Sequence, residues 1–330
     1  MQHALYGPHG FFTSGEGPAA HFRTSAHVGP PFARTLMTLV EQVDAALGRP
    51  ARLDVVDLGA GRGELVEAFR QVSAAWTNLA DRLHLVAVEL SPRPAHLDPS
   101  ITWSASMPDD VVGVVVANEW LDNVPLDVVQ MADGRAQLVE VDPLTGDEQL
   151  DSMVDDEILS WLHQWWPIDA ATDGDRVECG LTRDTAWADV IRQLGQGLAV
   201  AIDYCHTREQ RAAGTFASGT LAAHRKGRLV HPVPDGSCDL TAHVALDSCA
   251  AAGTRAGARD TRLVTQRQAL SALGLDASRP PLSAAHEAPG DYLTALSAAG
   301  AAAELLDSAG LGRFGWLIQS KRVAIPASLG

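Results

Sequence analysis

The chain has 330 residues, of which 46% are hydrophobic, and its formal net charge is −16 at pH 7. This length allows one large α/β domain or two smaller domains. The charge argues against a general nucleic-acid-binding protein, which needs a basic face, but suits a cationic partner. We find no apolar run long enough to span a membrane and no signal core at the start, so we expect a soluble, cytoplasmic protein.

The cysteines and histidines give no metal-binding pattern. None of the four cysteines stands in C-x-x-C spacing, and the histidines are scattered, so we expect free thiols and no metal site. The cysteines are Cys179, Cys205, Cys238 and Cys249.

Residues 1–28 are rich in glycine and lack periodicity, yet they hold four aromatic side chains. We expect an ordered flap over the functional site, with a surface-packed arm as the alternative. Pro30-Pro31 then opens a helix to about Leu47, because the apolar residues fall on one stripe. The aromatic residues of the flap are Tyr6, Phe11, Phe12 and Phe22.

A glycine loop follows the first predicted strand, 53–58, and precedes a helix expected from Glu64 to about Leu79. Gly59, Gly61 and Gly63 alternate, which lets a ligand approach the backbone closely. The spacing departs from the dinucleotide fingerprint G-x-G-x-x-G, and Asp57 would repel a pyrophosphate. A plain tight turn is the alternative to a ligand cradle.

S-adenosylmethionine fits these residues better than a phosphate-bearing cofactor. Its ammonium group suits Asp57, through water, and its carboxylate suits a helix N-terminus. Glu89, at the end of the predicted strand 83–89, is placed to hold the ribose hydroxyls. An NAD-dependent oxidoreductase is the rival interpretation. The predicted cofactor-binding residues are Asp57, Gly59, Ala60, Gly61, Gly63, Glu89 and Asn118.

The run 111–117 is continuously apolar, as in a central parallel strand, and a short strand at 101–103 precedes it. Trp103 could lie against an adenine ring or be a core residue. Polar groups at the carboxyl end of a central strand point into the ligand crevice of open α/β sheets. Asn118, Glu119 and Asp122 are therefore predicted to be functional, although Asp122 could merely cap a helix.

An insertion is expected at 126–178, with a hairpin turning at Asp133-Gly134 and a tryptophan-rich helix ending at Pro167. A helix at 181–194 and a fifth strand at 197–202 follow, and this strand leads into Asp203-Tyr204. The tryptophan cluster is typical of a core or an interface.

Residues 204–240 are expected to form a long irregular loop over the site. Asp239 or Thr241 is expected to cap the next helix, which places His243 on its first turn, facing the site or packing. The remaining chain predicts helix, strand, helix, helix and a final antiparallel edge strand at 314–319.

Six segments in this order resemble the MidA-like class I methyltransferases, from Tyr6 to about Val323. The Asn-Glu…Asp…Pro and Asp-Leu-Thr-Ala-His segments are more specific than the glycine loop. The matching segments are Phe22-Arg23-Thr24-Ser25, Leu58–Gly63, Asn118–Pro125, Ile202-Asp203-Tyr204, Gly219-Thr220-Leu221 with His224, and Asp239–Val244.

The resemblance implies an α/β, Rossmann-like class I methyltransferase sheet of seven strands with the last antiparallel, in a single domain over 1–330, using S-adenosylmethionine. One relative of this family is a protein arginine methyltransferase that serves in complex I assembly. The chain departs from the family pattern at two acids, replaced by His21 and His27, and at Ala20, Ala26 and Cys205.

For catalysis we expect Glu119 and Asp122, beside Asn118, to face the methyl acceptor, with Asp203 and His243 as further candidates. A guanidinium pairs bidentately with a carboxylate, so a protein arginine is one expected acceptor. The alternatives are a small-molecule O- or N-methyltransferase and a non-catalytic S-adenosylmethionine-binding assembly factor. No nucleic-acid or membrane partner is expected, and a homodimer stays open.

Overall fold

The computed structural model describes residues 1–13, 24–151, 154–166 and 168–329. The chain divides into two compact units. The first unit comprises Met1–Phe22, Glu119–Arg192 and Asp203–Ala258, and the second comprises Arg23–Asn118, Gln193–Ile202 and Arg259–Gly330. That 1–330 acts as a single domain stays a prediction. None of the described helices is long and apolar enough to cross a membrane.

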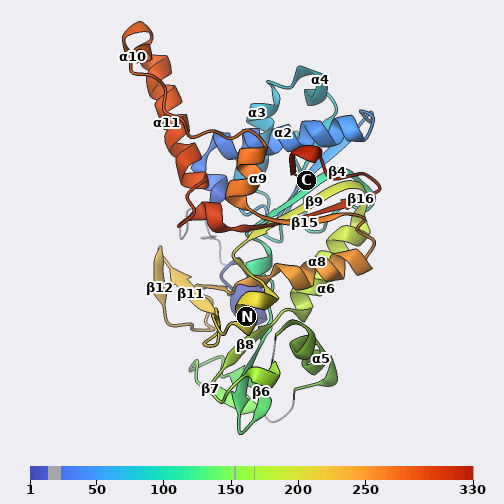
Figure 1. Cartoon of the computed structure of the whole chain (residues 1–330), viewed down its shortest axis with the longest axis vertical. Coiled ribbons are helices and arrows are strands. Elements are labelled where there is room, and N and C mark those ends of the chain that lie inside the picture. Colours follow the sequence, from blue (N-terminus) through green and yellow to red (C-terminus); the bar gives the residue numbers. More distant parts are fainter. Residues whose placement is uncertain (14–23, 152–153, 167, 330) are drawn as a thin grey trace. The chain divides into compact units, whose positions relative to one another are not determined.

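A seven-stranded sheet forms the centre of the second unit, in the order β15-β16-β9-β4-β1-β2-β3. The pairs of β1 with β2 and β4, of β2 with β3 and of β4 with β9 are parallel, whereas β15 and β16 are antiparallel. In Figure 1, β4, β9, β15 and β16 lie side by side. The predicted sheet is confirmed. Its strands are β1 Leu53–Leu58, β2 Leu83–Val88, β3 Thr102–Ser104, β4 Val111–Asn118, β9 Leu194–Asp203, β15 Thr261–Thr265 and β16 Gly315–Lys321.

The central strands are apolar because both of their faces are covered. All six residues of β1 are buried, and so are six of the eight residues of β4. Gly113 interrupts the valine run of β4 where the backbone of β1 is close, since a Cβ there would lie 2.0 Å from the carbonyl oxygen of Asp54. The sheet thus fixes the carboxyl ends of β1, β2 and β4, from which the candidate site residues extend.

The helix predicted to open at Pro30-Pro31 is confirmed as α2, whereas another predicted helix of the second unit ends earlier than expected. The predicted helix from Glu64 to about Leu79 is wrong at its end: α3 stops at Ser73 and a short α4 follows. Trp76 leaves the helical conformation there, with φ −102° and ψ 67°, and its indole donates to Glu41. The helices are η2 Ser25–Val28, α2 Pro30–Ala46, α3 Glu64–Ser73, α4 Thr77–Ala80, α9 Gln266–Ala272, α10 Ala284–Glu287, α11 Pro289–Leu305, η5 Leu311–Arg313 and η6 Ala327–Leu329.

The first unit contains a four-stranded sheet in the order β7-β6-β5-β8 (Figure 1). The predicted hairpin is confirmed, and Asp133 and Gly134 both have positive φ, as a tight hairpin turn requires. The two outer strands, β7 and β8, were not predicted. The elements are β5 Asp127–Ala132, β6 Arg135–Val141, β7 Glu148–Asp151, α5 Asp156–Trp165, η4 Ile168–Ala170, β8 Arg176–Cys179 and α6 Leu181–Gln193.

Trp161 and Trp166 are buried in the core between this sheet and α5, which confirms the core interpretation of the tryptophan cluster. Pro167, the predicted end of that helix, lies outside the described residues.

The segment 204–240 is not one irregular loop, so that prediction is wrong. It contains short elements because its backbone pairs with neighbouring segments: β11 pairs with both β12 and β13, and β10 pairs with β14. These elements are β10 Cys205–His206, α7 Arg208–Ala212, β11 Ala222–Arg225, β12 Arg228–Val230, β13 Asp239–Thr241 and β14 Val244–Ala245.

The predicted helix cap at Asp239 or Thr241 is also wrong. These residues lie in β13, and the helix α8, Leu246–Arg255, starts later with Ala245 as its N-cap. His243 therefore precedes the helix and lies between two short strands.

The N-terminal segment is divided between the units. Helix α1, Gln2–Tyr6, and Phe11 pack with Ala223, Cys238 and Leu240 in a small core of the first unit. In the second unit, the buried Ser25 donates a hydrogen bond to the side chain of Gln266 at 3.2 Å. Ala20, His21, Phe22 and Arg23 lie outside the described residues, so the expected flap over the site stays a prediction.

Candidate functional site

The glycine loop joins β1 to α3 in the second unit. Gly59, Gly61 and Gly63 have φ values of 75°, 58° and 86°, in the left-handed region that favours glycine. A Cβ on Gly63 would lie 2.8 Å from a methyl group of Leu97. Ala60, between the first two glycines, is buried and donates its N–H to Val88. The loop is thus a close-packed backbone turn at the carboxyl edge of the sheet, as predicted.

Three carboxylates accept backbone N–H groups from this loop and from the first turn of α3. The N–H of Gly61 donates to Glu89 at 3.0 Å, and the N–H of Arg62 donates to Glu64 at 3.0 Å. The N–H of Val66 donates to Asp57 at 3.2 Å. In dinucleotide sites such donors hold the pyrophosphate, but here each already has an anionic partner. The loop therefore suits a ligand with positive charge and hydroxyl groups rather than phosphates.

Asp57 is 3% exposed, and its surroundings make its charge costly. Burial, and then the neighbouring carboxylates Glu64 and Glu89, raise its pKa to about 7, although the N–H of Val66 lowers it. A cation bound beside the loop would favour the ionised form. These acidic residues fit S-adenosylmethionine, which carries two positive charges, on its sulfonium and its ammonium group, and one negative charge, on its carboxylate.

Glu89 and Trp103 are held by the same short segment. The N–H of Ser91 donates to Glu89 at 3.0 Å, and the indole N–H of Trp103 donates to the carbonyl oxygen of Ser91 at 3.0 Å. The indole also lies 3.6 Å from the position that a Cβ of Gly63 would occupy. Trp103 is half-buried and borders the glycine loop, which keeps the adenine-contact prediction open.

The other predicted catalytic residues belong to the first unit. The chain enters it directly after Asn118, the last residue of β4. Glu119 has φ 51°, a left-handed conformation that is uncommon outside glycine and is found more often at functional sites. Asp122 follows in η3, Leu121–Asn123, and is 4% exposed.

Buried carboxyl groups gather in the first unit. Asp203 accepts the N–H groups of Asp122 and Tyr204, at 3.1 and 2.9 Å. Asp239 accepts a hydrogen bond from the side chain of Asn123 at 2.9 Å. The Oδ1 atom of Asp122 is buried without a hydrogen-bond partner among the described residues. We call Asp122, Asp203 and Asp239 the acid cluster; it unites two predicted site residues with one that was expected to be a helix cap.

Arg183 of α6 is the buried cation of this region and was not predicted. Its guanidinium donates to four backbone carbonyl oxygens, those of Asp122, Val124, Ala242 and His243, at 2.5–3.1 Å. It is 1% exposed. The sequence did hold an indication: Arg183 lies four residues before Trp187 and eight before Ile191, on the buried face of the helix.

Because Arg183 bonds to carbonyl groups, it compensates the acids only through space. Burial raises the pKa of Asp122 to about 6, although Arg183 lowers it. Burial and the charge of Asp122 raise the pKa of Asp239 to about 8. Burial also raises the pKa of Asp203 well above its usual range, Asp122 adding to the effect and Arg183 opposing it. Arg183 thus offsets the charges of Asp122 and Asp203 only in part, and an additional cation would be stabilised here.

His243 belongs to the same unit, and its role in the site stays a prediction. Its ring stacks on Tyr204 with centroids 5.9 Å apart, and its backbone N–H donates to the hydroxyl of Thr220 at 3.0 Å. Thr220 in turn binds the buried Glu178, which also accepts the N–H groups of Thr220 and Leu221. The Gly219-Thr220-Leu221 segment therefore supports the backbone beside His243.

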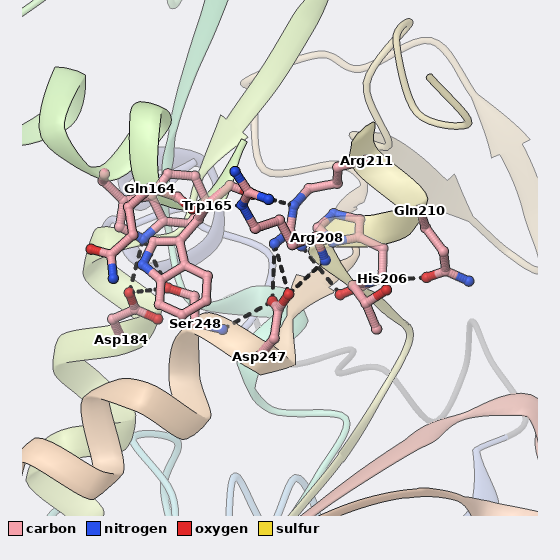
Figure 2. Close-up of polar contacts among 11 residues, drawn as sticks. Gln164, Trp165, Asp184, His206, Arg208, Gln210, Arg211, Asp247 and Ser248 are labelled. Atoms are coloured by element: carbon pink, nitrogen blue, oxygen red, sulfur yellow. Dashed lines mark hydrogen bonds and ion pairs between the residues drawn. The ribbon is translucent and has the colours of Figure 1, made fainter. Parts of the chain in front are cut away.

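A second buried polar network surrounds His206 (Figure 2). Nη2 of Arg211 donates to both carboxylate oxygens of Asp247, at 2.9 and 3.0 Å, and Nη1 donates to Nδ1 of His206 at 2.7 Å. Burial and the charge of Arg211 lower the pKa of His206 to about 3, so its ring is neutral. Figure 2 also shows Asp184 accepting a hydrogen bond from Ser248, which links α6 to α8. Through Arg211 and Asp247, this network joins α7 to α8. It was not predicted from the sequence.

The structure therefore sorts the predicted residues into two sets. The glycine loop, Asp57, Glu89 and Asn118 belong to the second unit, whereas Glu119, Asp122, Asp203 and His243 are assigned to the first. Chain connectivity links the sets, since Asn118 precedes Glu119 and Ile202 precedes Asp203.

A crystal structure of a protein from Burkholderia thailandensis, described as a likely methyl transferase and bound to S-adenosyl-homocysteine, is similar to this chain. The identity is 25% and the TM-score 0.80, over 98% of this chain and 87% of that one. A native crystal structure of an uncharacterised protein of the same superfamily and organism gives 26% identity and a TM-score of 0.80, over 99% and 87%. None of the curated proteins compared with the chain matches it.

Residues 32–264 match the model of the family described as "Putative S-adenosyl-L-methionine-dependent methyltransferase". This range covers most of the chain, the glycine loop and the acid cluster. The fold and the family predicted from the sequence are thus confirmed, and the class of cofactor agrees with the family description. The chain belongs to this MidA-like family.

Proposed function

We propose that the protein transfers a methyl group from S-adenosylmethionine to a nitrogen of a cationic acceptor, with the arginine side chain of a protein as the favoured substrate. The observation that carries the choice of acceptor is the acid cluster, in which Asp122, Asp203 and Asp239 are buried and Arg183 offsets the charge of Asp122 and Asp203 only in part. A guanidinium stays protonated at neutral pH and can pair bidentately with a carboxylate.

The cofactor is held by the second unit in this proposal. Gly59, Gly61 and Gly63 let it approach the loop, Asp57 attracts its ammonium, and Glu89 accepts hydrogen bonds from its ribose hydroxyls. When bound, S-adenosylmethionine supplies an electrophilic methyl group on its sulfonium. The family description and the S-adenosyl-homocysteine in the Burkholderia thailandensis relative support this assignment.

The acceptor is held by the first unit. Glu119 orients one nitrogen of the guanidinium and stabilises the positive charge as a proton leaves that nitrogen. Asp122, whose Oδ1 atom has no hydrogen-bond partner among the described residues, contributes negative charge. Positioning is the main contribution expected of the protein, because alignment of the reactants can lower the activation barrier by roughly 7–11 kcal/mol.

A labelling experiment tests the proposal. The full chain is incubated with methyl-labelled S-adenosylmethionine and either arginine-containing peptides, the same peptides with lysine at those positions, or a metabolite extract. Mass spectrometry should find the label on guanidinium nitrogen. Gly63→Val is the negative control, since valine would be strained at φ 86° and its side chain would press against Leu97.

One observation favours a small-molecule O- or N-methyltransferase as the second candidate. His27 stands where the family resemblance leads us to expect an acid, and it contacts Glu64 at 3.6 Å. An acid that could have helped to hold a guanidinium is therefore replaced. Label found only on metabolites would favour this candidate, and cofactor binding without any labelled product would favour a non-catalytic assembly factor.

A further inference from the structure

We infer that Glu64 and His27 form an opposed pair that sets how strongly the glycine loop prefers cationic S-adenosylmethionine to its neutral product, S-adenosylhomocysteine. The inference rests on the proposed use of this loop as the cofactor site. It assigns a specificity role to two residues outside the predicted cofactor set.

Glu64 brings a full negative charge to the glycine loop. Its Oε2 atom accepts the N–H of Arg62 at 3.0 Å and lies 3.5 Å from where a Cβ of Gly61 would be. Burial alone would raise the pKa of this carboxyl, but His27 and the backbone N–H groups of Glu64 and Arg62 lower it below its ordinary value. The group is therefore ionised and borders the open side of the loop.

His27 opposes this charge. Its Nδ1 atom accepts hydrogen bonds from the Thr24 hydroxyl at 2.8 Å and the Thr24 N–H at 3.4 Å, so the hydrogen is on Nε2. Nε2 lies 3.6 Å from Oε1 of Glu64, with the positive end of the ring toward the carboxylate. Thr24 fixes this orientation, and the buried Ser25 anchors the segment to Gln266.

Charge is what distinguishes the two ligands at this loop. S-adenosylmethionine carries a sulfonium in addition to its amino-acid charges, whereas S-adenosylhomocysteine has a neutral thioether. Both share the nucleoside and the amino-acid part, so loosening of the loop weakens both. The ratio of their dissociation constants reports mainly the electrostatic field at the sulfur.

The test measures both dissociation constants by calorimetry on the full chain. Glu64→Gln keeps an acceptor for the N–H of Arg62 but removes the charge, and it should lower the preference for S-adenosylmethionine about three- to tenfold. His27→Gln should raise the preference by about threefold, because Glu64 loses its opposing partner. Thermal unfolding verifies that each variant is folded.

Glu67→Gln is the matched control on the same helix. The carboxylate of Glu67 accepts hydrogen bonds from Arg70 at 2.6 Å and from Gln71 at 3.1 Å. Removing the charge of Glu67 should therefore change the ratio of the two dissociation constants less than about twofold. Equal shifts in Glu64→Gln and Glu67→Gln, or a lower ratio in His27→Gln, would overturn the inference. If the unchanged protein binds neither ligand, the proposed function fails instead. If it binds both with a ratio that no variant alters, only the inference fails.

Discussion

The glycine loop of the second unit and the acid cluster of the first both place carboxylates in or near the interior, but they satisfy them differently. In the loop, Asp57, Glu64 and Glu89 each accept a backbone N–H, so the acids shape the chain itself. In the acid cluster, the buried cation Arg183 donates to carbonyl groups, and an oxygen of Asp122 has no hydrogen-bond partner among the described residues.

The difference teaches that buried acids of similar type can serve as structural acceptors or as poorly compensated groups whose pKa is raised. The carboxylates of the loop each accept a backbone N–H from the loop or from the first turn of α3. The lone pairs that these carboxylates still have can accept hydrogen bonds from hydroxyl and ammonium groups. The acid cluster is incompletely compensated, which raises the pKa of its members and suits a cation. The predictions below test this contrast, beginning with the largest expected effect.

Arg183→Met should be the most damaging change. It leaves four buried carbonyl oxygens without their donor and removes the cation that compensates the acids. We expect the free energy of unfolding to fall by about 3–5 kcal/mol, measured by urea denaturation at pH 7. Arg192→Gln is the control, since Arg192 is an exposed residue of the same helix that forms an ion pair with Asp189. An equal loss in both variants would mean that the buried arginine has no special role.

Glu119→Gln should separate acceptor chemistry from cofactor binding. We expect turnover to fall about 100-fold, because the amide cannot hold the developing charge, while the dissociation constant of S-adenosylmethionine stays nearly unchanged. Steady-state kinetics and calorimetry measure the two quantities. Glu140→Gln, on the exposed side of β6, should change neither. Undiminished turnover in Glu119→Gln would remove this residue from the catalytic proposal.

Asp239 should make the protein less stable as the pH rises. Burial, and then the charge of Asp122, raise its pKa from the ordinary 3.8 to about 8, so the folded state binds the proton more tightly. Its stabilising contribution is complete below pH 3.8 and is lost as the pH rises through 8. Between pH 6 and 8 the free energy of unfolding should fall by on the order of 2 kcal/mol. In Asp239→Asn, which keeps an acceptor for Asn123, the same pH series should be flatter; an unchanged slope would show that Asp239 does not titrate in this range.

The ionisation of Asp57 with rising pH should produce the smallest of the four effects, a change in the affinity for the cofactor. The pKa of Asp57, about 7 in the free protein, means that this residue ionises as the pH rises from 6 to 8. Because the ionised form attracts the ammonium group, affinity for S-adenosylmethionine should rise about three- to tenfold over this range. Calorimetry should find this rise missing in Asp57→Asn. A rise that persists in the variant would assign the titration to another group.

The sequence by itself determined the sheet and the glycine loop. The buried runs of β1 and β4 are continuous and apolar, and the alternating glycines stand directly between strand and helix, so local pattern was sufficient. The Asp133-Gly134 turn was equally local, since only these residue types readily adopt two successive positive φ values.

The tertiary structure alone decided which side chains meet. Asp239 was expected to cap a helix, but it lies in β13 and binds Asn123, which is 116 residues away in sequence. Arg183 contacts carbonyl groups from segments about sixty residues away on both sides of it. Such contacts depend on how segments distant in sequence pack together, and hydrophobic periodicity does not encode that packing. Strands, turns and helices, in contrast, depend on the conformational preferences of residues that are neighbours in sequence.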